Sequence, residues 1–596
     1  MAVSDFPAGQ RRLSSPPRQG LSGSRRQEPG GQLPRLRVLW LLVVAILLAV
    51  TIWGRLAYWQ VVQHNGLGQL AGDQYLHSIP LPASRGLLLD REMRPLAVNS
   101  TVYDVTIAPS QIDVADRDRV GGVLSLVLGV DPQAMTTLLA SGKQFAYVAR
   151  RQPKEKVDQL RAARLPGVDL QAVEQRQYLP GGVPNSTLAS QLLGFVDWNG
   201  RGQRGVEQGY QKQLAGRPGH ESSYTDLYGR QIVLGPDSRV PAQNGAPLVL
   251  TVDANIQYAA EQAIAQGVQD AKAEAGSVIV MDTQTGGIVA WASAPGYDAN
   301  QFASQDPNRL RDPIAAQVYE PGSIMKVVTL AGAIDNGSIT PETTINDPGY
   351  INVGGVTLHD YDLANHGTIT MTNVLERSLN VGAVRAEEAM GKDAYLRNLK
   401  AFGFGQPSGI DVAGESASPL RQQWRDAELA TASYGQGVAV NMVQMCAALN
   451  AVSNGGVYVQ PHVVQSEAGR PVPIAAPRQV ISAQSAATMR MMMRSVVQHG
   501  AGHLARIPGF ELDEGGKTGT SNIPENGKYS KDVWASYAGF LPADNPRFTM
   551  LVVVKHPNNG SDDHNEGYYV SAPIWKTIAQ QMILQWRIAP ENLQPV

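Results

Sequence analysis

Three short motifs in this chain contain the residue types of a serine acyl-transfer site. They are Ser323-Ile-Met-Lys326, Ser378-Leu-Asn380 and Lys517-Thr-Gly519, in that order, and none of the three patterns recurs in the 596 residues. A serine hydroxyl is a poor nucleophile until a neighbouring base takes its proton, and a neutral lysine can be that base. The ordered trio therefore predicts acyl transfer through Ser323 without a histidine.

The first motif opens a predicted helix over residues 323–334. Ser323 and Lys326 share one face of its first turn, and the free N–H groups at the helix start favour a developing oxyanion. Desolvation and a second cation, for which Lys517 is the candidate, would lower the pKa of Lys326 so that it can act as a base. Taken alone, S-x-x-K is typical of an ordinary helix start with a solvated lysine.

The second motif offers a proton relay. Ser378 can pass a proton between Lys326 and an amine, and the Asn380 amide can hold Lys326 or a substrate carbonyl. Serine and asparagine are also common helix-capping residues, so the motif taken alone favours a helix cap.

The third motif lies in a predicted strand that borders the cleft. Lys517, with the hydroxyls of Thr518 and Thr520, can receive a carboxylate, and Gly519 leaves room for a substrate backbone. The Thr520 N–H can pair with the Ser323 N–H as an oxyanion hole. The expected catalytic residues are thus Ser323, Lys326, Ser378 and Asn380, and the expected binding residues are Lys517, Thr518, Gly519 and Thr520.

Bulk composition excludes several other classes of function. The net charge of −2 argues against a nucleic-acid binder. Cys446 is the only cysteine, so an intrachain disulfide and C-x-x-C metal sites are excluded, and its apolar surroundings indicate a core residue. No metal site and no cofactor is expected.

An apolar segment near the N-terminus predicts one membrane-spanning helix. Val38–Gly54 contains 17 uncharged residues between Arg37 and Arg55. As a helix they extend for about 25 Å, and residues up to 58 can lengthen the span. Seven arginines precede it, which favours a cytoplasmic N-terminus and an exported remainder. A cleaved signal peptide is the alternative, but no A-x-A site follows.

The remaining sequence divides into two regions behind a tail predicted to be disordered. We expect a basic cytoplasmic tail at 1–37, the transmembrane helix at 38–58, a β-rich pedestal at 59–245 and a catalytic domain at 246–596. In the last, Asp253 is expected to cap a helix from Ala254, a hairpin follows over 277–292, and three strands come late, before a helix that starts at Pro573. Strands at both ends with helices between predict an α+β fold, an antiparallel sheet covered by helices.

At these motifs the chain resembles the class B penicillin-binding proteins, the monofunctional transpeptidases of bacterial cell-wall synthesis. The resemblance rests on Tyr319–Lys326, Gly516–Thr520, Gly539-Phe540 and Tyr568–Pro573 in the catalytic region, and on Arg85-Gly86, Asp90-Arg91, Pro95–Ala97 and Gly202–Gly219 in the pedestal. Leu379 and Tyr569-Val570 depart from the family pattern, but none of them is a reacting group. The resemblance implies the penicillin-binding transpeptidase fold preceded by a pedestal (dimerisation-type) domain.

The resemblance also implies the reaction. Ser323 would attack the penultimate D-Ala carbonyl of a peptidoglycan stem peptide, release D-Ala, and pass the acyl group to an amine of a neighbouring stem. β-Lactam antibiotics would acylate Ser323 as slow-leaving mimics. The Tyr-Glu-Pro-Gly lead-in at 319–322 and the compact length look more like the division (septal) branch than the elongation branch. Family membership further implies divisome partners, among them a polytopic glycan polymerase, at the plasma membrane.

Other functions share these motifs. A serine β-lactamase would need a deacylating base but no pedestal or uncleaved anchor. A β-lactam sensor would carry a signalling module, for which the 37-residue tail is too short, and an inactive scaffold would have lost a motif residue. The pedestal and the lack of an obvious deacylating base in the sequence favour an amine over water as the acyl acceptor.

Overall fold

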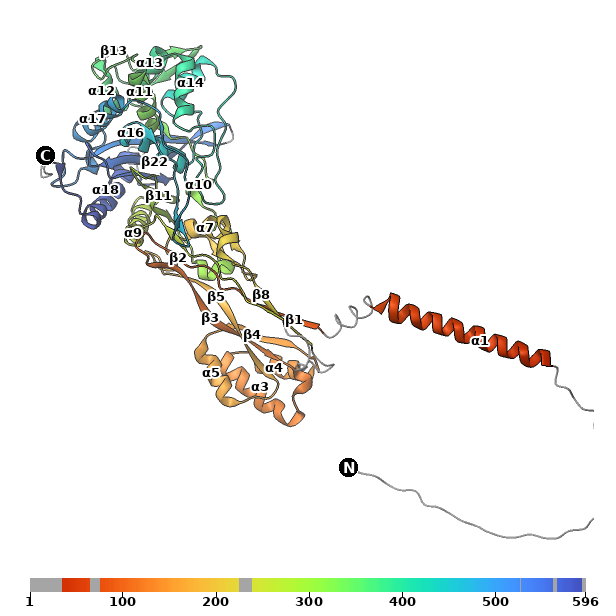
Figure 1. Ribbon diagram of the computed structural model, residues 1–596. Helices are drawn as coiled ribbons and strands as arrows, with labels where there is room; N and C mark the ends of the chain where they lie inside the picture. The colour runs from red at the N-terminus through yellow and green to blue at the C-terminus, as the bar shows by residue number, and fades with distance from the viewer. Residues whose placement is uncertain (1–34, 65–75, 225–237, 526, 561–564, 592–596) are drawn as a thin grey trace, which may run out of the picture. The chain divides into compact units, whose positions relative to one another are not determined.

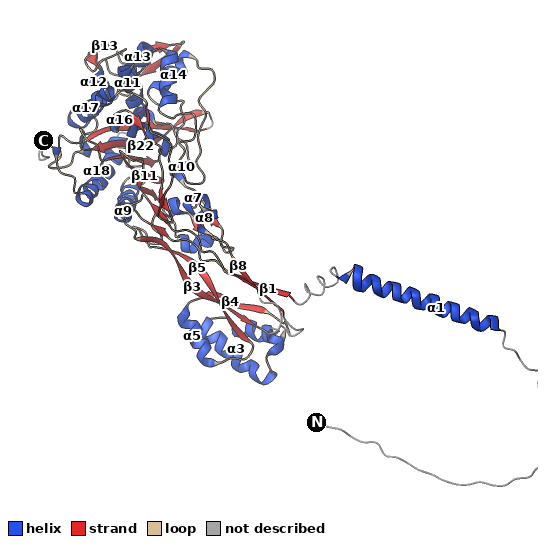
Figure 2. Ribbon diagram, viewed as in Figure 1, coloured by secondary structure: helices blue, strands red, loops and turns tan. Residues whose placement is uncertain are grey.

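The computed structural model describes residues 35–64, 76–224, 238–525, 527–560 and 565–591 (Figures 1 and 2). The tail predicted to be disordered lies almost entirely outside these residues. The chain forms two compact units, Met1–Ile79 with Glu221–Ser238, and Pro80–His220 with Arg239–Val596.

The first unit contains the apolar helix. Helix α1 spans Arg35–Ala57 and continues as a π-helical turn, η1, over Tyr58–Val62. The segment Arg37–Val62 has a mean hydropathy of 2.3 and is long and apolar enough to cross a membrane. Its large apolar side chains, such as Leu41 and Trp53, are exposed, which suits a lipid environment better than water. Strands β1 (Leu76–Leu81), β8 (Gly219–Tyr224) and β9 (Ser238–Val240) pair in that order.

In the pedestal, a long central strand carries two neighbours. β3 (Pro95–Ile107) pairs antiparallel with both β4 (Ala146–Gln152) and β5 (Val168–Tyr178). Helices α3 (Val114–Leu128), α4 (Pro132–Ala140) and α5 (Lys154–Ala163) pack on these strands through one apolar cluster that includes Val105, Leu124, Met135 and Leu160.

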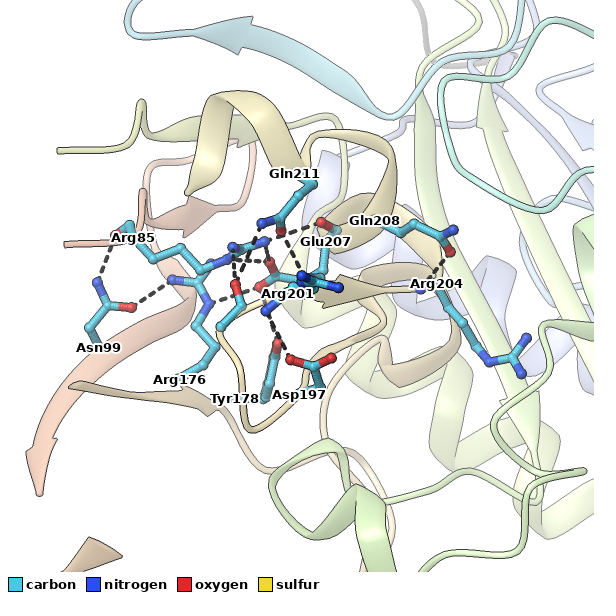
Figure 3. Close-up of polar contacts among 12 residues, drawn as sticks. Arg85, Asn99, Arg176, Tyr178, Asp197, Arg201, Arg204, Glu207, Gln208 and Gln211 are labelled. Atoms are coloured by element: carbon cyan, nitrogen blue, oxygen red, sulfur yellow. Dashed lines mark hydrogen bonds and ion pairs between the residues drawn. The ribbon is translucent and has the colours of Figure 1, made fainter. Parts of the chain in front are cut away.

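A buried ion cluster ties the pedestal together (Figure 3). Glu207, in α7 (Gly205–Gly209), is fully buried; its Oε2 accepts from Arg85 Nε at 2.7 Å and its Oε1 from Arg176 Nε at 2.8 Å. Tyr178 donates its hydroxyl to Oε1 at 3.1 Å, and Arg176 also donates to Asn99 Oδ1 at 3.0 Å. Two guanidinium groups thus depend on one carboxylate for compensation in a region from which water is excluded.

Glu207→Ala should therefore destabilise the protein strongly. Removal of one partner from a buried ion cluster leaves charges uncompensated, and the expected loss is about 3–5 kcal/mol in the free energy of unfolding. Denaturant unfolding measures it. The matched control is Asp116→Ala, which breaks the exposed pair with Arg119 at 3.3 Å and should cost less than about 1 kcal/mol. Equal losses in the two variants would contradict a special role of the buried cluster.

One sheet joins the pedestal to the catalytic region. Its strand order is β19-β18-β10-β2-β3-β4, with β5 also on β3. β10 (Leu248–Leu250) pairs parallel with β2 (Leu88–Leu89) and antiparallel with β18 (Val464–Glu467), which pairs with β19 (Arg470–Pro471). The domain boundary expected at 245/246 stays a prediction. Strands from both sides of that boundary pair in this one sheet.

The catalytic region is built on a five-stranded antiparallel sheet of order β12-β11-β23-β22-β21. The strands are β11 (Ala275–Asp282), β12 (Ile288–Ala294), β21 (Gly515–Glu525), β22 (Lys528–Leu541) and β23 (Phe548–Lys555). β11 pairs with β23 along its whole length, so the first strands of the sheet meet the last. The expected α+β fold is confirmed.

Helices cover both faces of this sheet (Figure 1). Because side chains alternate along a strand, Val278, Val280 and Val552 pack in one cluster with α9 (Ala254–Asp270) and α18 (Gly567–Trp586), while Ile279 and Leu551 pack in another with α11 (Met325–Asp335), α16 (Met442–Ser453) and α17 (Ala483–His499). As expected, Asp253 caps α9, accepting from Asn255 N at 3.0 Å.

The last helix starts earlier than the sequence predicts. We expected Pro573 at its first position, but α18 begins at Gly567 and Pro573 lies inside it. Packing explains the difference: Ser571 donates its hydroxyl to Ala535 O at 2.9 Å, and a side chain on Gly567 would collide with the backbone of β21 and β22. Tertiary contacts outweigh the tendency of proline to begin a helix.

The remaining elements surround the site or connect these layers. They are η2 (Pro109–Gln111), α6 (Ser190–Leu193), β6 (Phe195–Val196), β7 (Gly202–Gln203), α8 (Gln211–Leu214), η3 (Ala299–Ser304), α10 (Pro313–Ala316), η4 (Gly322–Ile324), β13 (Thr344–Asp347), β14 (Tyr350–Val353), β15 (Val356–His359), β16 (Gly367–Thr370), α12 (Met371–Arg377), α13 (Asn380–Met390), α14 (Lys392–Ala401), α15 (Asp426–Ser433), β17 (Val457–Tyr458), β20 (Arg478–Gln479) and η5 (His503–Ala505).

Candidate active site

Ser323 and Lys326 lie on one helical turn, as their spacing predicts. Ser323 is in the 3₁₀ turn η4, which leads directly into α11. The Lys326 ammonium is 3.1 Å from Ser323 Oγ, within hydrogen-bonding distance. Ser323 is partly exposed whereas Lys326 is fully buried. The solvent-accessible Ser323 hydroxyl thus lies next to a buried nitrogen, Lys326 Nζ, that can act as its base.

The surroundings of Lys326 favour its neutral form. Burial, and secondly the charge of Lys517, hold the pKa of Lys326 well below its usual value, while Asp360 and Asp347 act weakly in the opposite direction. Lys326 Nζ also contacts the Ser378 carbonyl oxygen at 2.5 Å. The structure agrees with the expectation that Lys517 is the second cation acting on Lys326.

Ser378 lies between the two lysines. Its Oγ accepts from Lys517 Nζ at 2.9 Å and is 3.5 Å from Lys326 Nζ. Ser378 ends α12 with a left-handed backbone, φ +61°, which places the residue between α12 and α13. Its side chain faces the two lysines, and α13 begins after Leu379 without a side-chain cap. A hydroxyl in contact with both ammonium groups can relay a proton.

Asn380 is the first residue of α13, and its side-chain amide donates to His359 O at 2.9 Å. The sequence suggested that this amide holds Lys326 or a substrate carbonyl. In the structure it instead connects α13 to β15, and its other interactions stay a prediction.

β21 brings the third motif to the edge of the sheet, beside η4. Lys517 is fully buried, and its ammonium also contacts Thr518 O at 2.9 Å and Thr518 Oγ1 at 3.3 Å. Burial lowers the pKa of Lys517 to about 7. Gly519 is required by protein packing as much as by any substrate, because a Cβ there would be 2.4 Å from Ser536 Oγ and 2.9 Å from Ile324 Cγ1.

The backbones of Ser323 and Thr520 approach each other through Gly322. A Cβ on Gly322 would be 2.8 Å from Thr520 O, and Gly322 has φ +57°, so both space and conformation call for glycine. Thr520 is exposed at the edge strand, and its Oγ1 accepts from Gly567 N at 3.3 Å. The N–H groups expected to form an oxyanion hole therefore belong to neighbouring segments at the mouth of the site.

Two acidic residues at the site were not expected from the sequence. Asp360 is buried and its Oδ1 accepts from Asn380 N at 2.5 Å and Val381 N at 3.0 Å. Glu320 accepts from Gly437 N and the Tyr529 hydroxyl, each at 2.9 Å. Asp360 belongs to no motif. Glu320 lies in the Tyr-Glu-Pro-Gly lead-in at 319–322, but its position in the sequence predicts no role at the site.

No motif residue is a metal ligand in the described part of the chain. One group there, Glu525, Asp532 and His556, has ligand atoms within 4.8 Å of one another. His556 lies between carboxylates, 2.9 Å from Asp532 Oδ2 and 3.3 Å from Glu274 Oε2. Cys446 is buried, as expected, and burial raises the pKa of its thiol.

Known proteins resemble this chain over most of its length. The model of the penicillin-binding protein transpeptidase domain matches residues 276–580, and that of the penicillin-binding protein dimerisation domain matches residues 80–250. The chain is 32% identical to penicillin-binding protein PbpB of Mycobacterium tuberculosis, over 93% of this chain and 84% of that protein. It is 29% identical to peptidoglycan D,D-transpeptidase FtsI of Escherichia coli, over 93% and 92% of the two chains. The crystal structure of penicillin-binding protein 3 from Mycobacterium tuberculosis with aztreonam has a TM-score of 0.65 at 27% identity, covering 86% of this chain and 98% of that one.

Proposed function

Because the chain belongs to the class B penicillin-binding proteins, we propose that it is a peptidoglycan D,D-transpeptidase that cross-links stem peptides through an acyl-enzyme on Ser323. The observation that carries the proposal is the position of the buried Lys326 side chain. Its Nζ is 3.1 Å from Ser323 Oγ, and burial together with the nearby cation Lys517 favours its neutral form. This arrangement supplies a nucleophile with its own base, which acyl transfer requires.

In the first half-reaction, neutral Lys326 takes the Ser323 proton while Oγ attacks the penultimate D-Ala carbonyl of a stem peptide. The N–H groups of Ser323 and Thr520 stabilise the oxyanion. The bond to the terminal D-Ala then breaks, and its leaving nitrogen takes a proton from Lys326, directly or through Ser378. Lys517, with the Thr518 and Thr520 hydroxyls, binds the terminal carboxylate, for which its charged form is needed.

In the second half-reaction, an amine of a neighbouring stem peptide attacks the Ser323 ester. The same base accepts the proton that the amine loses, and Ser323 Oγ recovers a proton as it leaves. The net result exchanges one amide bond for another, with one D-Ala released per cross-link. No metal or redox partner is needed to balance either half-reaction.

A penicillin adduct separates this function from a serine β-lactamase. The β-lactam carbonyl would acylate Ser323, and the expected adduct is stable for many minutes because the reaction favours an amine acceptor over water. Mass spectrometry of the intact protein after mixing with penicillin measures the adduct lifetime. Hydrolysis of the adduct within seconds, with accumulation of penicilloate, would contradict the transpeptidase assignment and indicate a serine β-lactamase.

We further propose that the enzyme works at the division septum, anchored by α1 with its N-terminus in the cytoplasm and its catalytic region outside. The Tyr319–Gly322 lead-in and the arginine-rich tail support this, and a polytopic glycan polymerase is the proposed partner of α1 and the pedestal. A fluorescently tagged copy should concentrate at septa. Label spread along the side wall and missing from septa would favour the elongation branch instead.

A further inference from the structure

Two buried carboxylates lie beside the Ser-x-Asn motif. Asp347 ends β13 and Asp360 follows β15, and both side chains are at most 1% exposed. Each has one oxygen already in use: Asp347 Oδ1 accepts from Gly349 N at 2.9 Å, and Asp360 Oδ1 accepts from Asn380 N and Val381 N. The other oxygen of each, Oδ2, is buried and has no hydrogen-bond partner in the described residues.

The two segments are also tied by the backbone. Asp360 N donates to Gly349 O at 3.1 Å, and His366 N donates to Asp347 O at 2.9 Å. Two buried carboxylates side by side repel each other when both are ionised. A buried acceptor without a donor is costly as well. One proton between the carboxyl groups relieves both costs, since it makes one oxygen a donor to the other.

We propose that Asp347 and Asp360 share one proton, and that this acid pair is a positioning device. It fixes the start of α13 through Asn380 N and Val381 N, directly after Ser378, which contacts both lysines of the active site. Asp360 is the acceptor of the shared proton, because its Oδ1 already accepts two backbone N–H groups at the N-terminus of α13. Asp347 carries the proton and donates it to Asp360. The inference rests on the proposed function for its kinetic test but not for its stability test.

The charges around the pair are consistent with this assignment. Burial, with a contribution from Asp360, raises the pKa of Asp347 to about 6, and His366 acts in the opposite direction. The pair faces Lys326 on α11, Tyr434 at the end of α15, and Tyr361 in its own loop. His366 is also 3.3 Å from Asp362. These groups are shared by wild type and by every variant below, so they do not bias the comparison.

The direction of the pH dependence follows from the raised pKa of Asp347. A carboxyl group whose pKa is higher in the folded than in the unfolded protein stabilises the fold below its ordinary pKa. That stabilisation is lost as the pH rises through about 6. Asp347→Asn replaces the titrating O–H by an amide N–H, which can still donate to Asp360 but cannot be lost at high pH.

The experiment compares wild type with Asp347→Asn at pH 5.5 and 8.0 by two measurements. In thermal unfolding, the melting temperature of the variant should rise relative to wild type between the two pH values, by about 1 °C. In penicillin acylation, the ratio of the rate at pH 8.0 to that at pH 5.5 should be about threefold or more higher in the variant, as the amide keeps the pair assembled. Asp131→Asn, which alters another aspartate that accepts two backbone N–H groups at a helix start, should behave as wild type in both.

Asp360→Asn is the second variant, should the first fail to fold. Its amide oxygen can still accept from α13 and its NH₂ can donate to Asp347, so the relative gain in melting temperature at pH 8.0 should recur. Asp360→Ala removes the contact with α13 and should slow acylation about tenfold.

Identical pH dependence in wild type and the asparagine variants would overturn the shared proton. A rise in wild-type melting temperature with added Zn²⁺, absent from Asp347→Asn, would also overturn it by placing a cation between the carboxylates. Wild type that melts as expected but is not labelled at all would refute the proposed function while leaving the pair intact.

Discussion

Ser323→Ala is expected to abolish covalent labelling by a fluorescent penicillin and to reduce cross-linking activity by about 10³-fold or more. The Lys326 ammonium, now 3.1 Å from Ser323 Oγ, would have no hydroxyl to activate, so no ester could form. The variant should remain folded, because Ser323 is partly exposed and alanine suits a helix start in size. Gel fluorescence and release of D-Ala from a stem-peptide substrate measure the two effects.

The control for this variant is Ser304→Ala. Ser304 is exposed at the end of η3 and donates only to Gln301 O, so its loss should leave labelling at the wild-type level. If Ser323→Ala retained a penicillin adduct, peptide mapping of the adduct would identify a different nucleophile, and the assignment of Ser323 would be wrong.

Lys326→Arg should be nearly as inactive as Lys326→Met. An arginine keeps the positive charge but stays protonated at every accessible pH, so it cannot accept the Ser323 proton. We expect acylation to slow by about 10²–10⁴-fold in both variants, the usual value of a positioned general base. Stopped-flow measurement of the acylation rate constant tests this. If arginine restored a large part of the rate that methionine loses, Lys326 would act as a cation and not as a base.

The wild-type pH profile should carry the same information. The acylation rate should rise with pH on the acid side as Lys326, with its lowered pKa, becomes neutral. It should fall above about pH 7 as Lys517 loses the charge that binds the carboxylate. A substrate without a carboxylate should lack the falling limb.

The sequence predicts the reacting residues of the site better than it predicts the buried residues that position them. Ser323, Lys326, Ser378 and Lys517 are fixed in type and order because the chemistry tolerates few substitutes, and the structure brings them together. Asp347 and Asp360 carry no such signature, since an acidic residue in a loop is usually solvated. Their importance depends on burial, which a single sequence does not show.

The same distinction applies to the secondary structure. Local patterns gave Asp253 as the cap of α9, the β11–β12 hairpin and the three late strands. They missed the true start of α18, because contacts of Ser571 and Gly567 with distant strands decide it. The pairing of β10 with β18, whose residues are more than two hundred positions apart, likewise cannot be read from local spacing.

The shared sheet of β2, β10 and β18 has a practical consequence for anyone who isolates the catalytic region. A protein cut at 245/246 would keep β10 and β18 but lose β2, and would expose unpaired backbone N–H and C=O groups along a new sheet edge. Such an edge promotes self-association. The smallest well-behaved soluble fragment should therefore begin before Leu88, and limited proteolysis of the intact protein should release the pedestal and the catalytic region together.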